Sequence, residues 1–169
     1  MTRRSSAVDH ASRRLLIALP DDYERARSRY ESLVPAVDLT AYDGTSSWDD
    51  VLAVTKQQAP HGFMRYFRID VAPTMALSGS TSRATEYLMG NHTIAERMLR
   101  HDPGVMLHAP LRTLLYAGPD GTVLALDQPS LLFASYGNPE IATVGRELDG
   151  LLATLVDLLG GDVPSQLLP

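Results

Sequence analysis

Three of the five histidines and three arginines gather between Asn91 and Arg112, so this stretch concentrates the side chains that could do chemistry. His92, Glu96 and Arg100 stand four residues apart, which places them on one face if the stretch is helical. A histidine and a carboxylate at this spacing can share one metal ion, but two ligands do not complete a metal site. A Glu96–Arg100 ion pair is the simpler interpretation, and no metal is expected.

His108 differs because it lies in an apolar run, between Leu107 and Ala109, where exposure is not guaranteed. An imidazole that lines a pocket can act as a general base or as a haem ligand, since its pKa lies near neutrality. A buried histidine with satisfied hydrogen bonds is the alternative. We take two histidines as candidate catalytic residues and four further polar residues as candidate ligand-binding residues. The first set is His92 and His108; the second is Asn91, Arg97, Arg112 and Tyr87.

These residues need elements that position them, and the sequence predicts a helix followed by a strand. Asn91 is a favourable N-cap, because its side-chain oxygen can accept from the free N–H groups of the first turn. Residues 102–104, Asp-Pro-Gly, end the helix, and residues 105–107 read as a short buried strand before Pro110. The face expected to point inward carries Ile94, Ala95, Met98 and Leu99.

The same stretch, with segments after it, resembles a known bacterial family. The matching runs are YLMGNHTIAERMLRHDP, MLHAPLR, DGTVLALDQPS and NPEIATVGRELD. Over residues 63–160 they resemble the family called domain of unknown function 302, which implies a TATA-binding-protein-like α+β fold and no particular activity. Many members of that family carry cysteine, asparagine and proline where this chain has Gly90, Asn91 and His92. A thiol-dependent activity is therefore excluded here.

The first third of the chain predicts a strand and two helices. Residues 13–19 alternate as a strand that Pro20 ends, and Asp21 with Glu24 forms a capping-box-like start for a helix. The side chains expected to face the core from that helix are Tyr23, Ala26, Tyr30 and Leu33. Residues 35–60 have a weaker pattern, with a short helix from Ser47 to Gln58, and they are the place for a lid or a specificity insertion.

The rest of the chain predicts strands, a hairpin and a long last helix. Residues 63–71 alternate with Phe63, Phe67, Ile69 and Val71 inward, and residues 74–78 read as another strand. Residues 111–117 and 122–127 flank a Gly-Pro-Asp-Gly turn, which is a strong hairpin signal. Residues 131–137 read as an apolar loop. Asn138 and Pro139 then start a helix whose core stripe is Ile141, Val144, Leu148, Leu152, Leu155 and Leu159.

This order of elements predicts an α+β fold, with a mainly antiparallel sheet and helices packed on one face. At 169 residues the chain is long enough for one well-buried core, so residues 13–160 are expected to form a single domain. Residues 1–12 are expected to be a flexible arm, and residues 161–169 a loose tail. The gap between sheet and helices is a natural place for a pocket.

Composition excludes several classes of function. The formal charge of −5 argues against nucleic-acid binding, which needs a basic stripe facing the phosphates. The chain has no cysteine, so disulfides and thiolate metal sites are excluded. The apolar run at residues 15–19 is too short for a signal-peptide core or a bilayer span, which predicts a cytoplasmic protein without a membrane partner. P-loop and dinucleotide motifs are absent, so no cofactor is expected.

Three functions from different classes fit these features. The leading hypothesis is a small organic ligand held between sheet and helices, with His92, His108 and Arg112 as polar anchors. The second is a cofactor-independent enzyme for proton transfer, with the two histidines as acid or base and Arg97 or Arg112 as an anion clamp. The third is a homodimeric interaction protein without a ligand. A homodimer through the last helix or a sheet edge is expected whichever function is correct, because this helix carries more apolar residues than one face can hold. Those surplus residues are Leu151, Val156 and Leu158.

Overall fold

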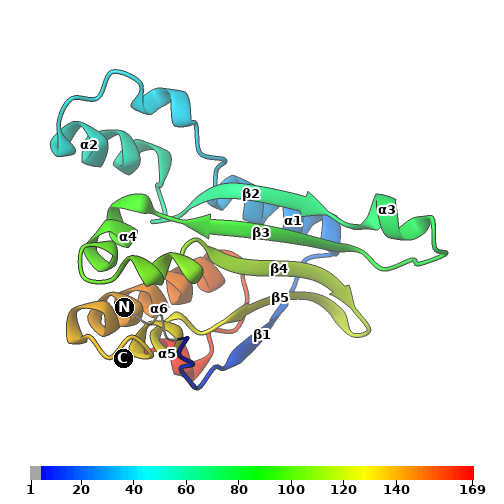
Figure 1. Ribbon diagram of the computed structural model, residues 1–169. Coiled ribbons are helices and arrows are strands. Elements are labelled where there is room, and N and C mark those ends of the chain that lie inside the picture. The colour runs from blue at the N-terminus through cyan, green and yellow to red at the C-terminus, as the bar shows by residue number, and fades with distance from the viewer. Residues whose placement is uncertain (1–4) are drawn as a thin grey trace.

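A five-stranded antiparallel sheet organises the computed structural model, which describes residues 5–169 (Figure 1). The strands lie in the order β1-β5-β4-β3-β2. They are β1 (Arg14–Leu19), β2 (Met64–Asp70), β3 (Ala84–Gly90), β4 (Leu111–Gly118) and β5 (Gly121–Asp127). Every neighbouring pair is antiparallel, and β4 and β5 form the predicted hairpin. The predicted α+β class is confirmed.

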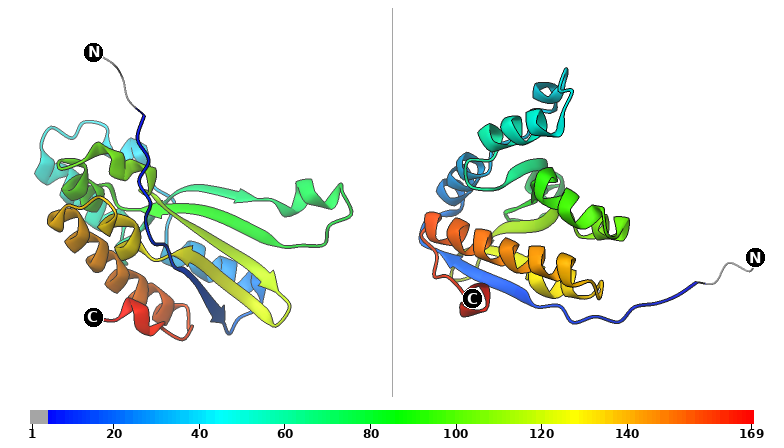
Figure 2. Two further views of the ribbon diagram at one scale, coloured as in Figure 1. Left: turned by 60° about the horizontal axis from the view of Figure 1, so that its bottom comes forward. Right: turned by 90° about the vertical axis from the view of Figure 1, so that its left-hand side faces the viewer.

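The helices of residues 23–33 and 139–158 pack on one face of the sheet. The other helices gather at one end of the strands, except for residues 72–76, which lie at the opposite end (Figures 1 and 2). The α-helices are α1 (Tyr23–Leu33), α2 (Trp48–Gln58), α3 (Ala72–Ala76), α4 (His92–Leu99), α5 (Pro129–Ala134) and α6 (Pro139–Leu158). The 3-10 helices are η1 (Leu39–Tyr42), η2 (Pro103–Leu107) and η3 (Ser165–Leu167). Within residues 5–169, no helix is long and apolar enough to cross a membrane.

The core lies between the sheet and the pair α1 and α6, and its polar groups are paired. Leu15, Ile17 and Leu19 alternate inward from β1, which forms where a strand was predicted. From α1, the buried Tyr30 hydroxyl hydrogen-bonds Thr113 Oγ1 of β4 at 2.8 Å, which ties the helix to the middle of the sheet. Among the residues described, every buried side-chain nitrogen or oxygen has a hydrogen-bond partner, as stable cores require.

The predicted helix starts are confirmed at Ser47 and Asn138, and the start of α1 is shifted by one residue. Ser47 and Asp50 form a capping box, and Asn138 Oδ1 accepts from the first turn of α6. At α1 the N-cap is Asp22, whose carboxylate accepts from two backbone N–H groups, whereas Asp21 pairs with Arg29. The cap belongs to the residue that directly precedes the first helical residue.

The face assigned to the middle of β2 was wrong. Phe67 and Ile69 were expected inward, but they are 46% and 44% exposed. The cause is a bulge: Arg65 pairs with Met89 and Phe67 pairs with Leu88, so Tyr66 is an extra residue. Because side chains alternate along a strand, one inserted residue moves all that follow it to the opposite face.

Three apolar stretches form short helices in place of the elements predicted for them. Residues 74–78 were expected to be a strand but belong largely to α3, with Pro73 in its first turn. Residues 105–107 were also expected to be a strand but lie in η2, which starts because Asp102 Oδ1 accepts from the N–H of Gly104 at 2.7 Å. The expected loop at 131–137 includes most of α5. Runs this short do not distinguish strand from helix by periodicity.

The last helix buries apolar side chains beyond its predicted stripe. All six residues of its predicted stripe are buried, and Val156 is fully buried as well. Leu151 lies against Gly62, where a Cβ atom would stand 3.1 Å from it. The surplus that suggested a dimer surface on α6 is therefore largely used inside the fold. The C-terminal segment, expected to be loose, packs on the domain through the buried Leu167 and through the Gln166 carbonyl, which accepts from Gln128.

Tyr30→Phe is expected to lower the free energy of unfolding by about 1–2 kcal/mol, because the buried Thr113 hydroxyl then loses its partner. Adding Thr113→Val should cost little more, since no unpaired hydroxyl is left behind. Urea unfolding of the two single variants and the double variant measures this coupling. Tyr116→Phe, on the opposite face, is the control and should be nearly neutral. Simple additivity of the two single changes would contradict the pairing.

Candidate functional site

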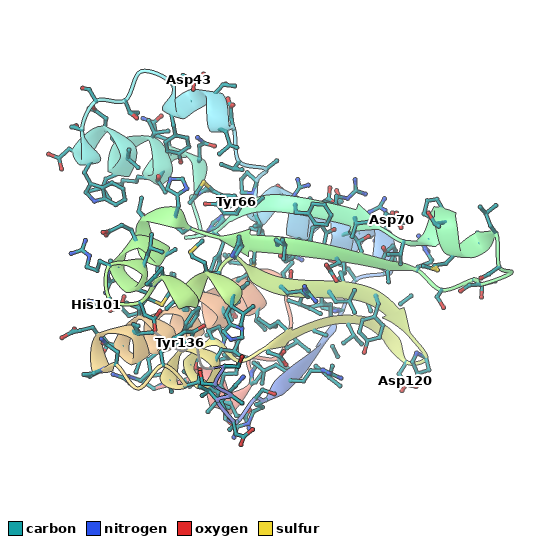
Figure 3. The ribbon with its side chains drawn as sticks, in the orientation of Figure 1. Asp43, Tyr66, Asp70, His101, Asp120 and Tyr136 are labelled. Carbon is teal, nitrogen blue, oxygen red and sulfur yellow. The ribbon has the colours of Figure 1, made fainter. Side chains whose placement is uncertain are left out.

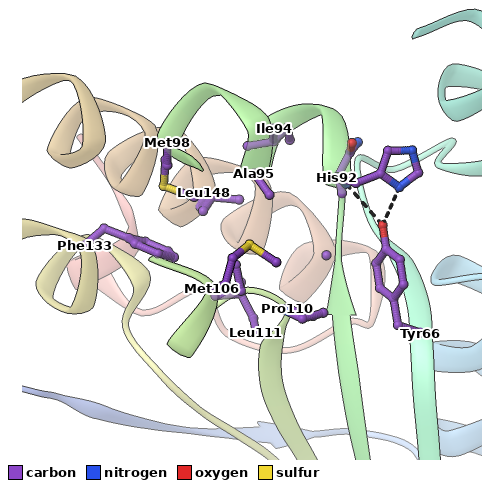
Figure 4. A pocket seen from close by; sticks show the side chains of 13 residues that line it. Tyr66, His92, Ile94, Ala95, Met98, Met106, Pro110, Leu111, Phe133 and Leu148 are labelled. Carbon is purple, nitrogen blue, oxygen red and sulfur yellow. Dashed lines mark hydrogen bonds between the residues drawn. The ribbon is translucent and has the colours of Figure 1, made fainter. Parts of the chain in front are cut away.

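An apolar cavity of about 250 Å³, here called the α4 cavity, lies between α4, η2, α6 and the ends of three strands (Figure 4). Phe133 stands at one end of it, and Tyr66 and His92 stand at the other (Figure 4). Its thirteen lining residues are mostly apolar: Tyr66, Gly90, Asn91, His92, Ile94, Ala95, Met98, Met106, Ala109, Pro110, Leu111, Phe133 and Leu148.

The cavity exists because α4 starts directly where β3 ends. Asn91 is the N-cap, and its Oδ1 accepts from the N–H of Thr93 at 3.0 Å while its Nδ2 donates to the carbonyl of Gly62 at 3.1 Å. This turns the chain within one residue, so that Ile94 and Ala95 face the strand ends across the cavity (Figure 4). Asn91 thus lines the cavity, but its side chain chiefly fixes the backbone around it.

The polar end of the cavity is a chain of hydrogen bonds through His92. Its Nδ1 lies 2.8 Å from the Tyr66 hydroxyl, and its Nε2 lies 3.0 Å from Thr55 Oγ1. Tyr42 OH lies 3.0 Å from the same threonine oxygen, and the Tyr42 ring stands edge-on to the imidazole with centroids 4.8 Å apart. His92 therefore joins β2 to the segment of residues 35–60, which was expected to act as a lid or a specificity insertion.

The hydrogen-bond partners of His92 determine which of its ring nitrogens carries the proton. The backbone N–H of His92 donates to the Tyr66 oxygen at 3.1 Å, so the hydroxyl proton of Tyr66 is available to donate to Nδ1. Thr55 Oγ1 donates to the carbonyl of Val51 at 2.8 Å, so it accepts from Nε2–H. The neutral ring consequently carries its proton on Nε2. One lone pair of the Tyr66 oxygen is left, at the polar end of the cavity.

Burial sets the charge state of this pair. It lowers the pKa of His92 below its usual value, and it raises the pKa of Tyr66 to about 12. Both side chains are therefore neutral at pH 7. A neutral histidine with both ring nitrogens hydrogen-bonded is well ordered, and its Nδ1 can gain a proton only if the Tyr66 hydroxyl passes on its own proton or turns away.

Tyr66 and Thr55 are the functional residues that sequence reasoning missed. Strand alternation placed Tyr66 among the outward side chains, and only the bulge turns it toward His92. Tyr66 lies beside the start of α4, at the opposite end of the sheet from Asp120 at the hairpin tip (Figure 3). Thr55 is 2% exposed on α2, and its contact spans 37 residues of sequence, so no local pattern could indicate it.

His108 lies apart from His92, in a second hollow with Arg112 and Asp127. It ends η2, and its ring stands edge-on to the rings of Tyr136 and His10, with centroids 6.1 and 5.8 Å apart. Burial lowers its pKa, and the neighbouring His10 lowers it further, while Asp127 raises it. The two candidate catalytic histidines thus do not share a cavity, but His108 and Arg112 do line one hollow together.

The remaining candidates have partners outside the α4 cavity. Arg97 makes a bidentate ion pair with Glu147 of α6, at 2.6 and 2.9 Å. Tyr87 is fully buried and donates to Glu31 of α1 at 2.9 Å.

Arg112 is 75% exposed, and its guanidinium lies 3.8 Å from the carboxylate of Glu86. The predicted Glu96–Arg100 ion pair is present. In residues 5–169, no three histidine or acidic side chains cluster closely enough to hold a metal ion.

Comparison with known proteins gives a family and a fold. The family model described as domain of unknown function DUF302 matches residues 42–159. A crystal structure of an uncharacterized conserved protein DUF302 from Bacillus stearothermophilus is similar, with a TM-score of 0.64 and 14% identity over 86% of this chain and 97% of that one. At this identity the likeness shows the fold alone. Among curated proteins, none matches this chain. The predicted resemblance is confirmed, and the match reaches back to Tyr42, which contacts His92.

The buried neutral state of His92 predicts a loss of stability in mild acid. An unfolded histidine has a pKa of about 6.5, so the unfolded chain binds a proton first as the pH falls. This contribution to the free energy of unfolding is complete above about pH 6.5 and is lost as the pH falls from there through the folded pKa of His92. His92→Gln, which cannot titrate, should show a shallower loss in urea unfolding between about pH 7.5 and about pH 4.5.

The control for this experiment is His101→Gln, which removes an exposed imidazole. His108 contributes in the same direction as His92 and remains in both variants, so the difference between them isolates His92. Equal pH dependence of the wild type and His92→Gln would contradict a neutral, buried His92.

Proposed function

We propose that this chain, which belongs to the DUF302 family, binds a small, neutral and mainly apolar organic molecule in the α4 cavity. The observation that carries the proposal is the cavity itself: an apolar space with one polar end. Ligand pockets are generally apolar with a few placed polar groups, and this cavity has that composition.

The volume limits the size of the ligand. An apolar cavity of about 150 Å³ in a protein core holds benzene, so about 250 Å³ has room for one ring with short substituents. The walls from Ile94, Met98 and Leu111 offer only hydrocarbon and sulfur atoms. The expected ligand is therefore a substituted single ring or a compact aliphatic molecule.

The lining also limits the charge of the ligand. Among the described residues that line the cavity, none is an aspartate, glutamate, lysine or arginine, and His92 is held neutral. A charged ligand would be buried without a counter-ion, which costs several kcal/mol. One hydroxyl is favoured, because it can donate to the remaining lone pair of the Tyr66 oxygen. Arg97 and Arg112, once considered as anion clamps, do not line this cavity.

Proton-transfer catalysis is the second candidate, and one observation favours it. Tyr42, Thr55, His92 and Tyr66 form a continuous hydrogen-bonded chain that ends in the cavity. Such a chain can take a proton from a bound molecule through Tyr66 and pass it to His92. A bound compound that changes chemically, at a rate that falls in Tyr66→Phe, would favour this candidate over simple binding.

Three related aromatic molecules test the proposal in a thermal-shift assay. Toluene and p-cresol should raise the unfolding midpoint, and p-toluate, which carries a charge, should not. At about ten times its dissociation constant a ligand adds about 1.4 kcal/mol, which corresponds to about 3–5 °C for a chain of this size. The stronger shift is expected from p-cresol, because only its hydroxyl can donate to Tyr66. Tyr66→Phe should abolish the difference between p-cresol and toluene.

A variant that fills the cavity gives the control. Ala95→Phe places a ring inside the α4 cavity and should abolish both shifts, whereas the same substitution at the exposed Ala134 of α5 should leave them intact. Ala95→Met is a smaller filling variant in case the phenylalanine is not accommodated. If neither neutral compound stabilises the wild type, or if both filling variants leave the shifts unchanged, the cavity is not the binding site.

A further inference from the structure

The sheet has a second face, and no helix of the core packs on it. On this side, here called the open face, lie the side chains that alternate away from α1 and α6. In the left view of Figure 2, β1, β4 and β5 lie in front of α1 and present this face. Its apolar members come from all five strands: Leu16, Phe67, Ile69, Leu88, Leu114, Tyr116, Val123 and Ala125.

The composition of the open face is unusual for a surface in water. An antiparallel sheet with one solvated face normally shows polar residues there, in alternation with the buried ones. Here Leu16 is 62% exposed and Phe67 and Ile69 are nearly half exposed, on strands at opposite edges of the sheet. Contiguous exposed apolar surface of this kind marks an interaction site.

The charges on the open face make it complementary to itself. Asp127 of β5 stands opposite Arg14 of β1, and Arg112 lies on the adjacent strand at the same end of the sheet. Arg112 is 75% exposed, and its guanidinium lies 3.8 Å from the carboxylate of Glu86. A face that carries both signs in one row can oppose them when it meets a copy of itself turned by a two-fold rotation. Nucleic acid would instead meet carboxylates within the face, on a chain of net charge −5.

The size of the face also suits a pair of chains. Five strands spaced about 4.8 Å apart, each about six residues long at about 3.3 Å per residue, give a face of about 24 by about 20 Å. Two such faces together bury on the order of 1,000 Å², which is the size of a weak or transient interface.

We infer that two copies of this chain pair through their open faces, sheet on sheet, with Arg112 of each copy against the partner's Asp127. Leu16, Phe67 and Leu114 then enter a shared apolar layer, as in the interior of a β-sandwich. The α4 cavity lies at the end of the strands and not on this face, so pairing and ligand binding use different surfaces.

Sedimentation velocity or light scattering of the full chain at micromolar concentration tests the pairing. The expected species has twice the monomer mass of 18.5 kDa. Leu16→Glu and Phe67→Glu each place a carboxylate in the apolar layer and should raise the dissociation constant about 100-fold or more. Leu77→Glu, at a leucine that is 90% exposed on the α3 connection, is the matched control and should leave the dimer intact.

A mixing experiment tests the charge pairing. Arg112→Glu and Asp127→Arg chains should each be monomeric, because each meets like charges in its own copy. Mixed in equal amounts they should form a dimer again, since both contacts then join opposite charges. A mixture that stays monomeric would overturn this pairing. So would a dimer that survives both Leu16→Glu and Phe67→Glu, or a wild-type chain that sediments as a single 18.5 kDa species.

Discussion

The bulge at Tyr66 is the constraint on which both surfaces of interest depend. One extra residue between Arg65 and Phe67 changes the pairing of β2 with β3. It aims the Tyr66 hydroxyl at His92, where it completes the polar end of the α4 cavity. It also moves Phe67 and Ile69 from the core side to the open face. Without the bulge the cavity would lose its hydroxyl, and the open face would lose two of its apolar side chains.

His92 holds together segments that are far apart in the sequence. Its backbone and ring bond to Tyr66 of β2, and its other ring nitrogen bonds to Thr55 of α2. These bonds offset the desolvation of a half-buried imidazole, but they do so only for the neutral ring. The same arrangement that orders the cavity therefore makes it sensitive to acid. The bond from His92 to Thr55 also explains why α2 belongs with the site, although α2 stands beyond β2 in the fold (Figure 1).

The two faces of the sheet have different physical roles. The face under α1 and α6 is closed by tyrosine hydroxyls that bond to sheet threonines, Tyr23 to Thr85 and Tyr30 to Thr113. Both bonds come from α1 and fix that helix relative to the strands, whereas α4 and α6 are joined by the Arg97–Glu147 ion pair. The open face has no such cover. Its exposed apolar side chains, and not those of α6, support the proposed pairing of two chains.

Sequence alone determined the α+β class, the hairpin, the caps at Asn91 and Asn138, and the family, because these follow from local periodicity, turn chemistry and recognisable motifs. It also indicated His92, through the clustering of polar residues after Asn91. Only the tertiary structure decided which residues join His92, since a bulge and a contact across 37 residues leave no local pattern. It likewise separated His92 from His108, and Arg97 and Arg112 from the cavity, because the direction of a side chain depends on how strands pair and helices pack.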